Sequence, residues 1–176
     1  MFQANRRNFS LMMLAALAAC GKQQTSPPRP QFKTYSGPPV TQVVVNKEAR
    51  RMHLVSGQTV LKSYDVGLGY QPVGHKQFEG DGKTPEGLYF IDRFNPRSTY
   101  HLSVGVSYPN DRDRAYAEAL RRHPGGDIFI HGRGPEGNLL APKRRDWTAG
   151  CIAVTDTEIE DIYPMIQAGV PIMIYA

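Results

Sequence analysis

Residues 127–154, DIFIHGRGPEGNLLAPKRRDWTAGCIAV, contain two short apolar runs separated by a polar segment rich in turn residues. The first run, 127–131, predicts a buried strand that ends at His131. The second run, 152–154, predicts another strand with Cys151 at its entrance. These strands indicate a β framework that places a histidine and a cysteine at strand ends.

Cys151 and His131 have the residue types of a thiol nucleophile and its base. The sequence has two cysteines, and the other, Cys20, lies in a predicted export signal. A thiol becomes reactive when it loses its proton, and a histidine can take that proton and return it to a leaving amine. Gly150 allows a sharp backbone turn and leaves room for a substrate. We expect the backbone N–H groups around Gly150 and Cys151 to form an oxyanion site.

Each candidate also has a structural alternative. Cys151 could be a buried small hydrophobe, and His131 a satisfied core histidine or a metal ligand. No cluster of His, Cys or acid residues at ligand spacing accompanies His131 in the sequence, so we expect no metal. We also expect no cofactor, because the chemistry of a thiol nucleophile needs only the thiol and its base. A papain-like protease is a weaker alternative, because its cysteine normally precedes its histidine along the chain.

The stretch resembles the YkuD (ErfK/YbiS/YcfS/YnhG) family of L,D-transpeptidases, whose motif is His-Gly, a spacer and then Ser/Thr-x-Gly-Cys. Here His131-Gly132 is followed by Thr148-Ala149-Gly150-Cys151. Further family-like segments are DGKTPEG at 81–87, YHLS at 100–103 and SYP at 107–109. The resemblance covers roughly residues 41–176 and implies a β-fold.

The resemblance implies a cell-wall enzyme that acts in peptidoglycan synthesis and cell shape. Cys151 would attack a carbonyl of a peptidoglycan stem peptide and His131 would exchange the proton, with the Gly132 carbonyl orienting His131. Thr148 is expected either to line the oxyanion site or to bond locally to the backbone. His101 is expected either to contact substrate or to pack in its strand. An amine acceptor would make the enzyme a transpeptidase, and water an amidase or carboxypeptidase.

Two positions depart from the commoner family pattern. Ala149 replaces a histidine or other polar residue, and Ala153 replaces an arginine that often engages a substrate carboxylate in relatives. The DWTxGCIAV form resembles a YafK-like subgroup that includes enzymes releasing lipoprotein from peptidoglycan. The departures leave a second class of function open, a catalytically inactive, lipid-anchored module that binds peptidoglycan.

Residues 1–20 resemble a lipoprotein signal peptide. Arg6 and Arg7 precede a short apolar run, and Leu17-Ala-Ala-Cys20 resembles a lipobox with lipid attached to Cys20. The sequence RRNF at 6–9 also resembles a twin-arginine signal. We expect export to the periplasm with a lipid anchor, at the outer membrane in a Gram-negative cell. The alternatives are a plain secretory signal or a buried N-terminal helix.

Residues 21–40 are rich in Pro, Gln, Ser and Thr and lack an apolar period, which predicts a disordered tether. An ordered arm near Phe32 and Tyr35 is the alternative. The net charge of +5 is a mild excess without a basic stripe interleaved with aromatics, so we expect no nucleic-acid partner. We expect a monomer.

Residues 41–176 predict one catalytic domain, a mainly β sandwich or barrel with one or two short helices. The β-rich runs lie at 41–45, 51–55, 60–66, 87–91, 100–106 and 170–175. Helices are expected at 113–122 and from Thr155 or Asp156 to Gln167, the second with a capping box between Thr155 and Glu158.

Overall fold

The computed structural model describes residues 29–176, and the predicted signal peptide with Cys20 lies outside these residues. Within 29–176 the elements are β1 (Gln42–Asn46), β2 (Arg51–Ser56), β3 (Thr59–Asp65), β4 (Gly87–Ser98), β5 (His101–Val106), α1 (Asp111–Ala119), β6 (Phe129–His131), α2 (Gly134–Leu140), β7 (Ile152–Ala153), α3 (Asp156–Ile162) and β8 (Pro171–Tyr175). The strands form one sheet in the order β3-β2-β1-β8-β4-β5-β6-β7. The prediction of a mainly β domain is therefore confirmed.

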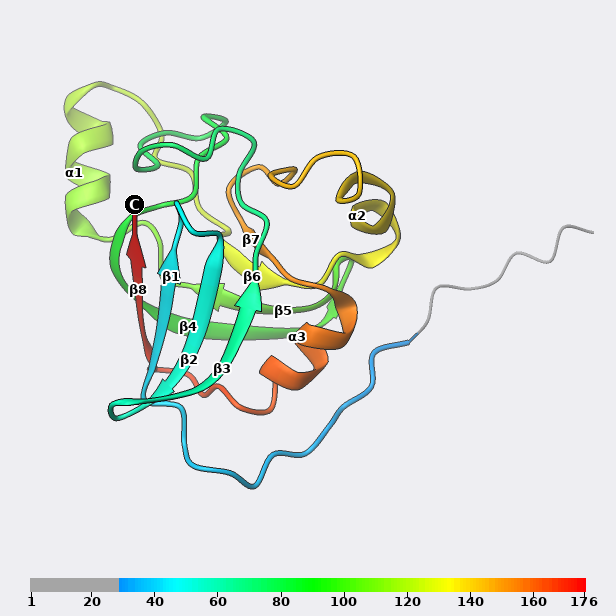
Figure 1. The fold of residues 1–176 in the computed structure, drawn as a ribbon. Helices are drawn as coiled ribbons and strands as arrows, with labels where there is room; N and C mark the ends of the chain where they lie inside the picture. Colours follow the sequence, from blue (N-terminus) through cyan, green and yellow to red (C-terminus); the bar gives the residue numbers. More distant parts are fainter. Residues whose placement is uncertain (1–28) are drawn as a thin grey trace, which may run out of the picture.

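The sheet folds over into two layers whose strands cross (Figure 1). Strand β4 joins the layers, because its first residues pair with β8 and the rest of the strand, from Ile91 on, pairs with β5. Isolated bridges from Gly67 to Ala153 and from Gly69 to Thr148 connect the segment after β3 to the region of β7. These bridges bring the two ends of the sheet together, as in a barrel, and they position the segment that contains Cys151.

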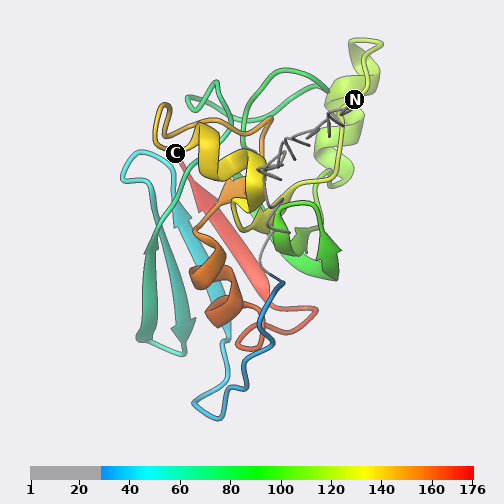
Figure 2. The ribbon, with the colours of Figure 1, turned by 90° about the vertical axis from the view of Figure 1, so that its right-hand side faces the viewer.

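The hydrophobic core lies between the layers. Alternating residues of β1 and β2 point inward, and Val43, Val45, Met52 and Leu54 are all fully buried. Every residue of β5 is buried, since α3 packs against β5 and β6 from the other side. Figure 2 shows α2 and α3 on the same side of the molecule. The active-site candidates therefore lie beside a well-packed interior.

The helix predicted at the C-terminal end is confirmed, with a different end point. Thr155 Oγ accepts a hydrogen bond from the Glu158 N–H at 3.2 Å, and the Thr155 N–H donates to the Glu158 carboxylate at 2.8 Å. This is the predicted capping box. Helix α3 ends at Ile162 and not at Gln167, because Pro164 has no N–H to continue the helical hydrogen bonds.

Helix α2 was not predicted from the sequence. The segment that begins Gly134-Pro135 has the composition of a turn, but proline is also compatible with the first turn of a helix. Helix α1 corresponds to the helix predicted at 113–122, and it starts earlier because Asn110 caps it and accepts from the Asp113 N–H at 3.1 Å. No helix of the described residues is long and apolar enough to cross a membrane.

Residues 29–40 contain no helix or strand and run past α3 before they enter β1 (Figure 1). The Gln31 N–H donates to Glu160 at 2.9 Å, and Lys33 pairs with Asp161 at 2.6 Å. The ring of Phe32 meets the ring of Tyr163 edge to face. This described part of the segment predicted as a tether thus contacts the domain.

Candidate active site

His131 lies at the C-terminal end of β6 with only 3% of its surface exposed. Its Nδ1 donates a hydrogen bond to the Gly132 carbonyl at 2.5 Å. Because a carbonyl oxygen only accepts, Nδ1 carries the proton and Nε2 carries the lone pair of the neutral ring. Burial lowers the pKa of His131, while the Gly132 carbonyl and Asp156 act in the opposite direction. The ring is therefore held in the tautomer that can accept a proton at Nε2.

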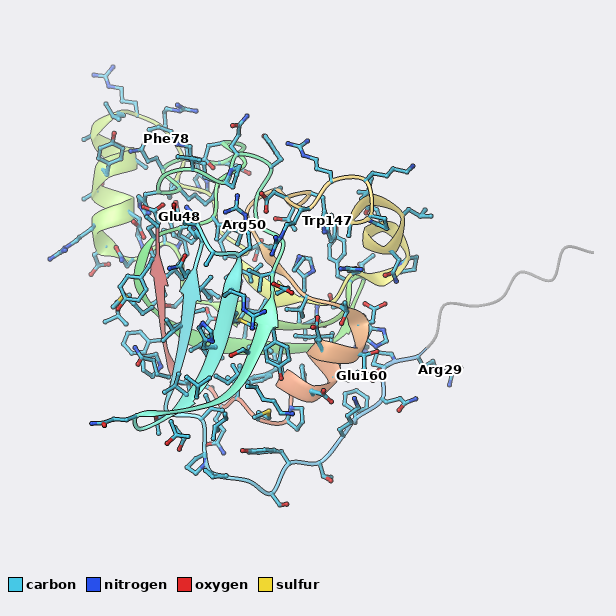
Figure 3. The ribbon with its side chains drawn as sticks, in the orientation of Figure 1. Arg29, Glu48, Arg50, Phe78, Trp147 and Glu160 are labelled. Carbon is cyan, nitrogen blue, oxygen red and sulfur yellow. The ribbon has the colours of Figure 1, made fainter. Side chains whose placement is uncertain are left out.

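Two aromatic rings enclose His131. The Tyr100 ring lies 4.6 Å away between centroids, and the Trp147 ring approaches by its edge at 5.8 Å. Trp147 also lies beside α2 (Figure 3). A Cβ at Gly137 of this helix would come within 2.6 Å of the indole ring. Helix α2 thus supports one wall of the site. From sequence we assigned Tyr100 no role, and its place beside His101 in the YHLS segment is the signal that could have identified it.

Asp156 fixes the turn that follows His131. One carboxylate oxygen accepts from the N–H groups of Arg133 at 2.7 Å and Gly134 at 2.8 Å, and the other accepts from the Asn138 amide at 2.9 Å. Asp156 is the first residue of α3, so these bonds connect the turn, α2 and α3. From sequence we considered Asp156 only as a helix cap, because its partners are more than fifteen residues away.

The packing of the same turn explains the glycine at position 132. A Cβ there would lie 2.7 Å from an Asp156 carboxylate oxygen and 2.9 Å from the Tyr100 carbonyl oxygen. Any side chain would therefore displace the backbone that orients His131. The carbonyl oxygen of Gly132 contacts Nδ1 of the imidazole.

Cys151 precedes β7 and lies on the same sheet face as His131. Strands β6 and β7 are parallel, with Ile130 opposite Ile152 and His131 opposite Ala153. Because side chains alternate along a strand, Cys151 and His131 are diagonal neighbours on one face. The Cys151 thiol is free and partly exposed, and it donates to the Asp127 carbonyl at 3.4 Å and not to His131.

The resting thiol is protonated. Burial raises the pKa of Cys151 to about 11, against the opposing effect of a hydrogen bond from the Phe129 backbone. Since the pKa of His131 is lowered, both the thiol and the imidazole are uncharged at neutral pH.

The loop before Cys151 is fixed by hydrogen bonds of the Thr148 hydroxyl and by the close packing of Gly150. Thr148 Oγ donates to the Cys151 carbonyl at 2.7 Å and accepts from the Gly150 N–H at 3.2 Å. Gly150 has φ +141°, and a Cβ there would lie 2.7 Å from the Lys83 carbonyl oxygen. Thr148 thus bonds locally to the backbone. The Gly150 N–H already donates to Thr148 Oγ. An oxyanion site at the predicted position would therefore rely on the Cys151 N–H.

A pocket of about 470 Å³ opens at Cys151. Its lining residues are Lys76, Glu79, Gly80, His123, Gly125, Gly126, Asp127, Ile128, Ala149 and Cys151. Asp81 organises the wall at 76–80, accepting from Lys76 Nζ at 2.9 Å and from the Gln77 N–H at 2.8 Å. Burial of Asp81 is outweighed by these bonds and by those from other backbone N–H groups, so its pKa is lowered. Asp81, the first residue of the DGKTPEG segment, therefore supports the pocket wall without lining the pocket.

His101 does not line this pocket. It is 9% exposed, and its Nε2 lies 2.8 Å from the Glu160 carboxylate of α3. Of the two roles expected from sequence, this placement is that of a packed strand residue. Among residues 29–176, no three His, Cys, Asp or Glu side chains are grouped as ligands for a metal ion.

The model of the YkuD family, described as the L,D-transpeptidase catalytic domain, matches residues 41–174. The Escherichia coli K12 protein named "Putative L,D-transpeptidase YafK" is 26% identical over 179 residues, covering 93% of this chain and 65% of that protein. The chain thus spans less than two thirds of the length of this curated relative.

Solved structures show the same fold. The helical cell shape determining protein Pgp2 from Campylobacter jejuni is similar with a TM-score of 0.61 and 27% identity, covering 80% of this chain and 49% of that one. Bd1075 from Bdellovibrio bacteriovorus has a TM-score of 0.53 and 22% identity, covering 85% of this chain and 54% of that one.

Proposed function

Since the chain belongs to the YkuD family of L,D-transpeptidase catalytic domains, we propose that it forms a thioester between Cys151 and a peptidoglycan stem peptide. The observation that carries the proposal is the arrangement of two side chains on one sheet face. His131 has its Nδ1 proton on the Gly132 carbonyl, which leaves Nε2 to take the proton of the neighbouring Cys151 thiol.

The reaction proceeds in two transfers. Cys151 Sγ passes its proton to His131 Nε2 as the sulfur attacks the substrate carbonyl carbon, and the tetrahedral oxyanion is stabilised by the Cys151 N–H. The C–N bond then breaks, and His131 returns the proton to the leaving amine. An incoming nucleophile, deprotonated by His131, attacks the thioester carbonyl and releases the Cys151 thiol.

The nucleophile in the second transfer decides the product. An amine of another stem peptide gives a crosslink, which is L,D-transpeptidation. Water gives hydrolysis, as an amidase or carboxypeptidase, and release of a wall-linked lipoprotein is one form of it. Because both routes use the same thiol and imidazole, we propose the shared thioester and leave the acceptor to experiment. A contribution to cell shape is proposed from the likeness to Pgp2.

We also propose that the domain is exported and held at the periplasmic face of a membrane by lipid on Cys20. The support is the sequence of residues 1–20, with its Arg6-Arg7 pair and the Leu17-Ala-Ala-Cys20 lipobox-like motif. Metabolic labelling with a fatty acid tests it. Label on the wild-type chain and none on Cys20→Ala is the expected outcome.

Mass spectrometry of muropeptides tests the function directly. Purified enzyme is incubated with disaccharide-peptides, with and without an added amine acceptor, and Cys151→Ala is the control. Crosslinked or amine-exchanged products indicate a transpeptidase, and shortened or released peptides indicate a hydrolase. If wild type forms neither product and no covalent adduct with a carbapenem, while its thiol is reduced, the enzyme proposal is wrong and an inactive binding module replaces it.

A further inference from the structure

A second pocket, of about 210 Å³, lies on the Ala153 side of the site. Its lining residues are Asp65, Val66, Gly67, Arg133, Ala141, Arg145, Trp147 and Ala153. Two of them connect it to the catalytic residues. Trp147 touches the His131 ring with its edge, and Ala153 is paired with His131 across β6 and β7. The pocket is therefore adjacent to the place where the acyl group reacts.

The charges around this pocket are predominantly positive. The guanidinium group of Arg133 has no hydrogen bond or ion pair within residues 29–176. Within residues 29–176, Arg145 is held by three long contacts, 3.4 Å each, to the Val66 and Arg50 carbonyls and to Asp65. Asp65 is shared with Arg51, which it meets at 3.2 Å. Two guanidinium groups with unused donors therefore face a space lined by one acid that is already paired.

The shape of the pocket suits a small anionic group on a peptide. Gly67 and Ala153 leave the floor free of long side chains, and Trp147 offers an apolar wall. A guanidinium group can bind a carboxylate through two parallel hydrogen bonds, which fixes both position and orientation. Ala153 is two residues after Cys151, so the pocket lies about 7 Å along the strand from the nucleophile. That is about two residues of an extended peptide.

We propose that Arg133 and Arg145 bind a free carboxylate of the stem peptide whose carbonyl is attacked by Cys151. The inference rests on the proposed function and adds the group that the enzyme recognises. Stem peptides carry such carboxylates on their isoglutamyl and diaminopimelyl residues. The carboxylate enters the Arg133–Arg145 pocket, while the reacting carbonyl lies over the sulfur.

Binding measured without turnover tests the pocket. In a Cys151→Ala background, the affinity for a muropeptide with free carboxylates is compared with that for the same muropeptide after amidation of those carboxylates. We expect the free form to bind about tenfold or more tightly, because charge-assisted bidentate bonds are lost on amidation. Arg133→Gln combined with Arg145→Gln should reduce the preference to near unity. Lys143→Gln, an exposed change outside the pocket, should keep it.

The outcomes separate the two proposals. If the parent shows no preference, or the double variant keeps it, the carboxylate pocket is wrong whatever the activity of the enzyme. If the preference is found and lost as expected but the enzyme with Cys151 intact never becomes acylated, the pocket stands and the proposed catalysis fails. Thermal unfolding of each variant confirms that the folded domain was measured.

Discussion

The ring of Tyr100 lies against the imidazole of His131, with 4.6 Å between centroids and 30° between planes. The Trp147 ring makes a T-shaped contact with the same imidazole, and the Gly132 carbonyl accepts a hydrogen bond from Nδ1. The orientation, tautomer and burial of His131 are thus set by different groups. The Tyr100 ring supplies burial, and burial is the main cause of the lowered pKa of His131.

Removing that ring should weaken catalysis and alter its pH dependence. We expect Tyr100→Ala to lower kcat/KM by about 10- to 100-fold, because a misplaced base loses the geometry of proton transfer. Tyr100→Phe keeps the ring and should stay within a few-fold of wild type. The acid limb of the kcat/KM profile should move up in pH for the alanine variant only. Equal losses in both variants would assign the effect to the hydroxyl instead.

The lowered pKa of His131 predicts the acid limb of the wild-type profile. Free histidine titrates near 6.5, so kcat/KM should fall only below about pH 6.5 as Nε2 becomes protonated.

The lowered pKa of His131 also affects the stability of the fold. Since the unfolded chain binds this proton more readily than the folded one, the free energy of unfolding should decrease as pH falls through 6.5. Urea unfolding between pH 7.5 and 5 measures it, and His131→Gln should lack this component.

Alkylation kinetics report the state of the Cys151 thiol. With its pKa raised to about 11, the thiolate is a minor species at neutral pH. The rate of iodoacetamide modification, located by peptide mapping, should rise about tenfold per pH unit from pH 7 to 9 without a plateau. A plateau near pH 7 would mean that the free enzyme holds a thiolate–imidazolium pair and that the protonated resting state is wrong.

Much of this site can be predicted from local sequence. The apolar run that ends at His131 and the strand after Cys151 follow from residue patterns, and the Thr155–Glu158 capping box follows from spacing. These features depend on neighbours a few positions apart. The fold class follows from the number of short strands separated by turns, and the two-layer sheet agrees with it.

The parts that sequence did not predict depend on contacts between distant segments. Tyr100 reaches His131 across thirty-one positions, and its place in the YHLS segment does not indicate which ring it contacts. Helix α2 forms from a glycine- and proline-containing segment because Trp147 packs on Gly137 and Asp156 binds Asn138. The bonds of Asp156 to the turn after His131 likewise exist only once α3 is docked.

Asp156 should therefore be needed for both stability and rate. Asp156→Ala leaves the N–H groups of Arg133 and Gly134 without their acceptor, and we expect a loss of about 1–3 kcal/mol in the free energy of unfolding. The kcat should also fall, because the turn that carries the Gly132 carbonyl loosens. Asp161→Asn on the same helix is the matched control, since Asp161 is 40% exposed and, among the residues that the structure describes, its side chain bonds Lys33 alone. If the two variants behave alike, Asp156 has no special role.

Glu160 links the segment at 29–40 to the interior. We expect this link to contribute more to the free energy of unfolding than the neighbouring exposed ion pair between Lys33 and Asp161. Glu160 lies on α3 beside this segment (Figure 3). Its carboxylate accepts from the Gln31 N–H at 2.9 Å and contacts His101 Nε2 at 2.8 Å, and Glu160 is only 8% exposed. We expect Glu160→Leu to cost about 1–3 kcal/mol, because both partners lose a buried acceptor, and the Gln31 amide should exchange faster with solvent. Lys33→Gln, which removes an exposed ion pair, should cost no more than about 1 kcal/mol.

The pH dependence gives the sharper test of Glu160. Its burial favours the neutral acid, but the bonds from Gln31 and His101 outweigh burial and lower its pKa. A carboxylate with a lowered pKa stabilises the fold above its unfolded pKa of about 4.3, and this contribution disappears as pH falls through the folded pKa. The stability gap between wild type and Glu160→Leu should therefore be full at pH 6 and shrink toward pH 3. A gap that is constant over that range would show that Glu160 acts through packing alone, without the charge that binds Gln31 and His101.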